Sequence, residues 1–310
     1  MPYCGETGGQ AIICNDSAGV TVIGLGDMGG ALAEALLENN YSTTVWNRSA
    51  ERMKPFGDKG AATCSDLAEA ISINLVSILC VSDHATSMDI LSRSGVESAL
   101  EGRTLIQLST MTSSESRDLA NRLAALGGSY LDGQILSYPA DVRENRANIV
   151  CSGPRDLFQR YQALLSAMAG RAHYVGERIG AAPTFDKAHL SWAMGNYLVF
   201  LQAAAMCASS GVDLRAWCDY NLHHLAEGRV HRELELLATQ ICNRDYDEGL
   251  DASMDVWLSV INKTITECLE IGVDQVHLAR LGELAETAVK SGKGQQELGV
   301  LFEQLAVEPK

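Results

Sequence analysis

The sequence predicts an α/β fold with a doubly wound parallel sheet, then one long helix and an all-helical C-terminal domain. Three observations support this fold class. Between residues 20 and 150, short β-branched runs alternate with helical patterns, which is typical of a parallel sheet with crossover helices. A glycine-rich turn stands between the first strand and the first helix. After about residue 180 only helical patterns follow.

Four strands are predicted in the first half of the chain. Residues 20–23 and 42–46 are short β-branched runs, and each is followed by turn residues. Residues 75–81 are apolar on both sides, as expected for a buried parallel strand. Residues 104–108 repeat this pattern.

Helices are predicted between and after these strands. Leu32, Leu36 and their neighbours form an apolar helical face, and Asp66 is a plausible N-cap of a second helix. Residues 117–126 predict a helix that ends at the following glycines. Residues 183–210 form one long helical pattern. Its interior Gly195 costs roughly 1 kcal/mol relative to Ala, which predicts close packing at that point.

The length of 310 residues suggests about two domains. We expect a cofactor-binding domain over residues 19–180, and an interdomain helix with a helical dimerisation and substrate domain over residues 181–310. Residues 1–18 have no basic start and no long apolar stretch, so they do not resemble a signal peptide. We expect them to be a leader with no assignable role.

Composition excludes several classes of function. The net charge of −15 without a basic cluster argues against nucleic acid or anionic membranes as partners. No apolar run is long enough to span a membrane. The nine cysteines include no C-x-x-C pair, so no metal site is expected. Their odd number and apolar surroundings indicate reduced thiols in a cytoplasmic protein.

The segment from Gly24 to Gly29 reads G-x-G-x-x-G, follows the first strand and opens the first helix. Gly24 permits the tight turn, Gly26 lets a pyrophosphate approach the backbone, and Gly29 lets the helix pack on the strand. The free N–H groups at the helix start favour the phosphates. This context predicts a Rossmann-type dinucleotide site, with Leu25, Asp27 and Met28 also lining it.

The end of the second strand indicates which dinucleotide binds. An NAD site usually carries Asp or Glu here to accept a hydrogen bond from the ribose 2′-hydroxyl, whereas this chain has Asn47. Arg48, Ser49 and Arg52 can instead bind a 2′-phosphate, because guanidinium groups match phosphate geometry. The sequence therefore predicts NADPH rather than NADH.

The loops after the third and fourth strands are expected to complete the cofactor site. Val81, Ser82 and Asp83 follow the third strand, near the expected position of the ribose. Ser109 and Thr110 follow the fourth strand. In a parallel sheet, ligands bind outside the carboxyl ends of the strands, where both loops lie.

The chain also resembles a known superfamily. Residues 22–53, VIGLGDMGGALAEALLENNYSTTVWNRSAERM, resemble the opening of the β-hydroxyacid dehydrogenases and most closely that of the imine reductases. The resemblance continues at 107–110 (QLST), 131–135 (LDGQI), 272–274 (GVD) and 291–294 (SGKG). It implies that Ser109 and Thr110 lie beside the nicotinamide. It also implies a homodimer with exchanged helices, in which each active site combines residues of both chains.

The two groups differ at the start of the long helix. Hydroxyacid enzymes carry a lysine six residues after a glycine, and an asparagine four residues later. Counted from Gly180, these positions hold Asp186 and Leu190, and many imine reductases have aspartate at the first. A carboxylate stabilises an iminium cation, whereas ketone reduction needs a cationic acid beside the developing alkoxide. The resemblance thus implies C=N reduction, with Asp186 as cation anchor or proton donor.

The roles of several other residues are less closely defined by the sequence. His189 lies one helical turn beyond Asp186, as a second proton donor or a packing residue. Met111, Tyr138, Trp192 and Met194 are the expected substrate contacts. Two alternatives to imine reduction stand beside it. One is a hydroxyacid or carbonyl reductase that uses Lys187, and the other is a protein that binds NADPH without catalysis.

Overall fold

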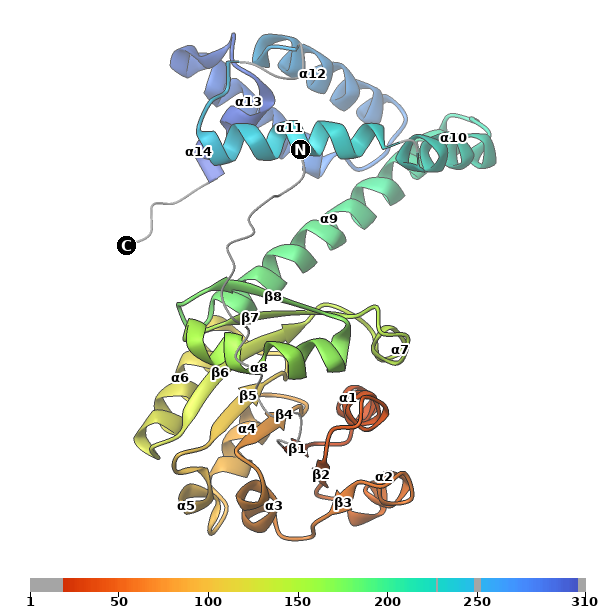
Figure 1. Ribbon diagram of the computed structural model, residues 1–310. Helices are drawn as coiled ribbons and strands as arrows, with labels where there is room; N and C mark the ends of the chain where they lie inside the picture. The colour runs from red at the N-terminus through yellow and green to blue at the C-terminus, as the bar shows by residue number, and fades with distance from the viewer. Residues whose placement is uncertain (1–18, 227, 248–251, 306–310) are drawn as a thin grey trace, which may run out of the picture. The chain divides into compact units, whose positions relative to one another are not determined.

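A computed structural model of the chain describes residues 19–226, 228–247 and 252–305 (Figure 1). The predicted leader, residues 1–18, lies outside the described residues. The chain divides into two compact units, the first ending at Ser191 and the second beginning at Trp192. The division falls inside a single helix, α9 (Ala181–Ser209), ten residues beyond its first residue.

The first unit contains an eight-stranded sheet in the order β3-β2-β1-β4-β5-β6-β7-β8. Neighbouring strands are parallel except for β6 and β7, which run antiparallel. The predicted doubly wound sheet is therefore confirmed, with one reversal that the sequence did not indicate. The strands are β1 (Val20–Ile23), β2 (Thr43–Trp46), β3 (Ala62–Thr63), β4 (Val76–Leu79), β5 (Thr104–Gln107), β6 (Ser129–Ile135), β7 (Asn148–Ser152) and β8 (Arg171–Gly176).

Helices cover both faces of this sheet (Figure 1). One apolar core lies under α1 and α8, and a second lies under α3, α5 and α6. Every residue of β1, β2, β4 and β5 is buried, because both faces are covered. The helices of this unit, besides α9, are α1 (Asp27–Glu38), α2 (Lys54–Gly57), α3 (Leu67–Ile73), α4 (His84–Leu91), α5 (Val96–Leu100), α6 (Ser113–Ala125), α7 (Pro139–Arg143) and α8 (Arg155–Ala169), with a 3₁₀ turn η1 (Ala50–Arg52).

In the described residues of the second unit, every regular element is a helix, and the core centres on Met254, Ile261 and Ala285. No helix in the described part of the chain is both long and apolar enough to cross a membrane. After α9, its elements are α10 (Leu214–Ala226), α11 (Arg229–Asn243), α12 (Met254–Glu270), α13 (Val276–Ala288), a π-helical turn η2 (Val289–Lys293), a 3₁₀ turn η3 (Leu298–Leu301) and α14 (Phe302–Leu305).

Local sequence signals explain the starts of α3 and α6. Asp66 caps α3 as predicted, since its carboxylate accepts a hydrogen bond from Glu69 N at 2.8 Å. The helix expected from residue 117 begins earlier, at Ser113, because Thr112 and Glu115 form a capping box. The expected close packing at Gly195 does not occur within the described part of the single chain, where a Cβ at this position would meet no atom within 4 Å.

Candidate active site

The loop between β1 and α1 has the geometry of a phosphate-binding turn. Gly24 adopts a φ of +97°, and a Cβ there would lie 2.3 Å from the Cys80 carbonyl oxygen. A Cβ at Gly29 would lie 2.0 Å from the Gly24 carbonyl oxygen, so only glycine lets α1 approach the turn this closely. At Gly26 a Cβ would meet nothing within 4 Å, which leaves a space that a bound pyrophosphate fits.

The loop after β2 is fastened to this turn. Asn47 Oδ1 accepts a hydrogen bond from Leu25 N at 3.0 Å, and its Nδ2 donates to Ser49 O at 3.1 Å. Arg52 Nη1 donates to Leu25 O at 3.3 Å. Asn47 and Arg52 therefore hold two cofactor loops together. Arg48 and Ser49 are exposed at the edge of the resulting cavity.

This cavity has a volume of about 430 Å³ and lies where the strand order reverses, between β1 and β4. Most of the predicted cofactor residues line it, but Asp83, Ser109 and Thr110 do not. The predicted residues that do so are Gly24, Leu25, Gly26, Asp27, Met28, Asn47, Arg48, Ser49, Arg52, Val81 and Ser82. Cys80 also lines the cavity, and burial raises the pKa of its thiol to about 12, so it is no nucleophile.

One wall of the cavity was not anticipated from the sequence. Thr86, Asp89 and Ile90 of α4, together with Arg93, face the glycine turn. The Arg93 guanidinium lies over the ring of Trp46, 5.2 Å from its centroid, and donates to Asp89 at 2.9 Å. The available signal was the N-cap at Asp83, because positions 86, 89, 90 and 93 then share one helical face.

Two buried glutamine side chains hold the loop after β5 in place. Gln107 Nε2 on β5 and Gln134 Nε2 on β6 both donate to Ser109 O at 3.2 Å. Ser109 Oγ accepts a hydrogen bond from Val81 N at 2.8 Å, which ties this loop to the one after β4. Thr110 is exposed beside them. Met111, a predicted substrate contact, is instead 1% exposed and belongs to the second core.

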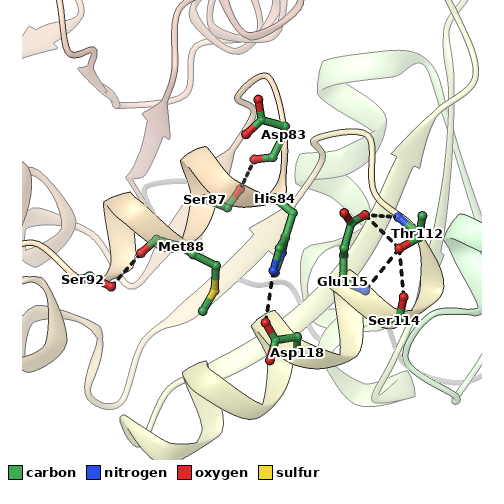
Figure 2. Close-up of polar contacts among 9 residues, drawn as sticks. All are labelled: Asp83, His84, Ser87, Met88, Ser92, Thr112, Ser114, Glu115 and Asp118. Atoms are coloured by element: carbon green, nitrogen blue, oxygen red, sulfur yellow. Dashed lines mark hydrogen bonds and ion pairs between the residues drawn. The ribbon is translucent and has the colours of Figure 1, made fainter.

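Figure 2 shows the start of α4 against α6. Asp83, predicted to contact the cofactor, caps α4 by accepting from Thr86 N at 2.7 Å, and this hydrogen bond is the main reason that its pKa is lowered. His84 points to α6, where its Nε2 lies 3.1 Å from Asp118 Oδ2. Glu115 folds back on Thr112 and accepts from its backbone N at 2.7 Å.

A buried carboxylate fixes the start of α9. Asp132 on β6 is fully buried and accepts hydrogen bonds from Gly180 N at 2.9 Å and Ser116 Oγ at 2.9 Å. Ser152 Oγ donates to Asp132 at 3.3 Å and accepts from Ala182 N at 2.9 Å. Burial raises the pKa of Asp132 against these hydrogen bonds. Sequence reasoning did not assign it, although a lone charge inside an apolar strand was a signal.

Asp186 lies in the second turn of α9, beyond this anchor. Its side chain is 9% exposed, whereas that of Lys187 is 43% exposed. Lys187 Nζ donates to Asp186 Oδ2 at 2.6 Å. By helical periodicity, Lys187 leaves the backbone about 100° round the helix from Asp186. The long lysine stem instead brings its ammonium back to the carboxylate, so the two positions form an ion pair.

The remaining predicted site residues, the candidate proton donor His189 and the three other substrate contacts, are exposed. His189 lies on the solvent side of α9 in the first unit, and Tyr138 precedes α7 there, 80% exposed. Trp192 and Met194 are exposed on the part of α9 that belongs to the second unit. Within the first unit, Tyr138 and His189 line neither of its two described cavities. In the part of the chain that the structure describes, no cluster of His, Cys, Asp or Glu could hold a metal ion.

The chain matches two protein-family models in succession. Residues 19–176 match the NAD binding domain of 6-phosphogluconate dehydrogenase. Residues 179–307 match the C-terminal domain of NADPH-dependent reductive aminase-like proteins. The two matches meet close to Gly180, where α9 begins.

Full-length relatives agree with both models. The chain is 30% identical over 292 residues to the NADPH-dependent reductive aminase of Aspergillus oryzae, covering 93% of this chain and 97% of that protein. An imine reductase variant from Myxococcus stipitatus in complex with NAD⁺ has a TM-score of 0.85 at 26% identity, over 94% of this chain and all of that one. The reductive aminase of Aspergillus terreus in complex with NADPH and ethyl levulinate gives 0.77 at 28% identity, also over 94% of this chain and 100% of that one.

Proposed function

The chain belongs to the family of NADPH-dependent reductive aminases and imine reductases, and from that premise we propose that it reduces a small imine or iminium to an amine with Asp186 at the substrate nitrogen. It is an NADPH-dependent oxidoreductase acting on C=N bonds. The observation that carries the residue assignment is the nearly buried Asp186 carboxylate, one turn beyond the anchored start of α9.

NADPH is the cofactor, and Arg48 and Ser49 are the residues proposed to bind its 2′-phosphate. Both are exposed at the cavity edge, whereas Asn47 and Arg52 are engaged with Leu25. No carboxylate stands at position 47 to repel a phosphate. Because a charge-assisted hydrogen bond contributes roughly 1.5–3 kcal/mol, Arg48→Ala should weaken NADPH binding about tenfold or more.

A fluorescence titration with NADPH and with NADH tests this assignment. NADH affinity should stay the same in Arg48→Ala, since NADH carries no 2′-phosphate. Arg160→Ala, on the exposed face of α8, is the matched control and should bind both cofactors as the wild type does. Equal losses for NADPH and NADH would contradict a role at the 2′-phosphate.

The proposed role of Asp186 follows from charge. When NADPH is bound, its nicotinamide supplies the hydride for the C=N carbon. An iminium is more readily reduced than a neutral imine because its carbon is more electrophilic. A carboxylate beside the nitrogen stabilises that cation, and a protonated carboxyl group could deliver the proton to a neutral imine. Either role needs only the one carboxylate of Asp186.

Asp186→Asn tests this role. Turnover of a cyclic imine, followed by loss of NADPH absorbance, should fall by about 10² or more, the scale of a lost acid–base group. NADPH affinity should stay the same, since Asp186 does not line the cofactor cavity. Asp156→Asn, an exposed aspartate on α8, is the control for the loss of one charge. Unchanged turnover in Asp186→Asn would remove this residue from the mechanism.

Reductive amination is a second candidate, favoured by the C-terminal domain match and by the Aspergillus oryzae relative. In that reaction the enzyme acts on a ketone and an amine supplied together. Wild-type turnover of ketone plus amine, beyond the rate that free imine in solution accounts for, would support it. Turnover of the ketone alone, retained in Asp186→Ala and lost in Lys187→Ala, would instead support a carbonyl reductase that uses Lys187.

We also propose a cytoplasmic homodimer with exchanged helices. The second unit exposes a run of large apolar residues on α9, which a partner chain would cover. Gly195 in the same helix has no close neighbour in its own chain, and a partner helix would explain a glycine there. The run comprises Tyr197, Leu198, Val199, Phe200 and Leu201. Free thiols at all seven described cysteines support a reducing compartment.

A further inference from the structure

We propose that Lys187 is a built-in competitor of the substrate, which occupies the cation site on Asp186 until an iminium or ammonium displaces it. This inference rests on the proposed function, in which Asp186 binds the substrate nitrogen. Lys187 Nζ lies 2.6 Å from Asp186 Oδ2, where a protonated substrate nitrogen would bind. Two cations cannot share this carboxylate without mutual repulsion. A substrate cation should therefore bind more tightly once Lys187 has left.

The ion pair of Asp186 and Lys187 neutralises the Asp186 charge when no substrate is bound. A nearly buried carboxylate without a counter-ion is strongly disfavoured, because its charge has lost most of its hydration. The Lys187 ammonium supplies the counter-ion while its own side chain stays 43% exposed. The Lys187 ammonium can thus move into solvent, where water replaces the carboxylate as its partner. The Asp186 carboxylate stays in place on its helix.

Glu115 is a second carboxylate that could pair with Lys187 after it leaves Asp186. Glu115 on α6 is fixed by Thr112, which donates to it from its backbone N at 2.7 Å and its Oγ1 at 2.8 Å (Figure 2). These hydrogen bonds chiefly lower the pKa of Glu115, and the charges of His84 and Lys187 contribute to the same shift. Ser113 Oγ at the start of α6 lies 2.7 Å from Thr184 Oγ1 on α9, so Glu115 and Lys187 stand on adjoining helix starts. In the proposed exchange, Glu115 is the anion that receives Lys187 when the substrate occupies Asp186.

Substitutions of Lys187 and of Glu115 test whether Lys187 competes with the substrate for Asp186. The probe is pyrrolidine in its ammonium form, titrated calorimetrically into the NADP⁺-loaded protein at neutral pH. Lys187→Met should bind the ammonium roughly three- to tenfold more tightly than the wild type, because the competitor is gone. Lys187→Arg keeps the positive charge and should bind like the wild type. A damaged fold would weaken ammonium binding, so tighter binding by Lys187→Met can be attributed to the loss of the competing cation.

The second arm examines Glu115. Glu115→Gln should weaken ammonium binding roughly two- to threefold, because Lys187 loses its alternative partner. In the Lys187→Met background the same substitution should change little, so the two effects are coupled in a double-mutant cycle. Cyclopentanone, a neutral probe of similar size, should bind the wild type and Lys187→Met equally.

Failure of this inference is separable from failure of the proposed function. If Lys187→Met binds the ammonium no better than the wild type, or if neither protein binds it, the competition is refuted. If Asp186→Asn also binds the ammonium as well as the wild type, the assignment of Asp186 to the substrate nitrogen is refuted too. A loss of binding in Asp186→Asn with no gain in Lys187→Met refutes the competition alone.

Discussion

At the scale of single residues, the glycines of the phosphate loop serve different purposes. Gly29 is required by the fold, since its position lies against the carbonyl oxygen of Gly24. Gly26 has room for a side chain within the protein, and its backbone angles of −70° and −173° suit any residue. Gly26 is therefore required by the ligand and not by the fold.

This difference predicts opposite behaviour of two alanine variants. Gly29→Ala should lower the free energy of unfolding by roughly 1–3 kcal/mol, because the new Cβ forces the turn and helix apart. Gly26→Ala should melt like the wild type but bind NADPH about tenfold more weakly or worse, because its Cβ occupies the space for the phosphates. Thermal unfolding without nucleotide and an NADPH titration measure the two effects. Equal melting temperatures for both variants would contradict the assignment.

At the scale of elements, the start of α9 is held by hydrogen bonds with three other elements. Asp132 and Ser152 accept hydrogen bonds from Gly180 N and Ala182 N, so β6 and β7 together fix the first turn. Ser113 Oγ also donates to Gly180 O at 2.6 Å, which adds α6 to the contact. The position of Asp186 relative to the sheet follows from these three elements.

The raised pKa of Asp132 makes this anchor pH-dependent. A carboxyl group whose pKa is higher in the folded than in the unfolded state stabilises the fold at low pH, and this contribution disappears as pH rises through the folded pKa. The free energy of unfolding of the wild type, relative to Asp132→Asn, should therefore increase as pH falls toward the unfolded pKa of about 4. Urea titrations of both proteins across this range measure the difference. A difference that shrinks toward low pH would contradict the raised pKa.

Elements with strong local signals were predictable. The β-branched runs at β1 and β2 and the cap at Asp66 gave correct strands and a correct helix start, because neighbouring residues determine them. β7 was not among the predicted strands, and its reversal was not predictable either, since its run of buried residues carries no signal of strand direction. The ion pair of Asp186 with Lys187 was missed because helical periodicity describes where a side chain leaves the backbone and not where a long one ends.

At the scale of the whole molecule, the exposed apolar run on α9 sets the expected assembly. Leu201 is 65% exposed there, which is unusual for a leucine among other exposed apolar residues. A net charge of −15 would by itself oppose association, so a dimer needs a substantial apolar contact.

The wild type should therefore sediment as a dimer, and Leu201→Glu should shift it toward monomer by burying a charge at the interface. Imine turnover should fall with dimer content, because each proposed active site uses both chains. Leu75→Glu is the matched control: Leu75 is 69% exposed and directly precedes β4 in the first unit. A monomeric wild type, or a dimer insensitive to Leu201→Glu, would contradict the exchanged-helix assembly.

The anchoring of α9 at Asp132 also bears on how such an enzyme diversifies. The cofactor loops, the anchor and Asp186 all belong to the first unit, whose folding determines their mutual positions. None of the hydrogen bonds described for the cofactor loops and the anchor involves a residue from Trp192 onward. Directed evolution toward new amines can therefore concentrate its libraries on the second unit, while the residues proposed to handle charge and cofactor are inherited unchanged.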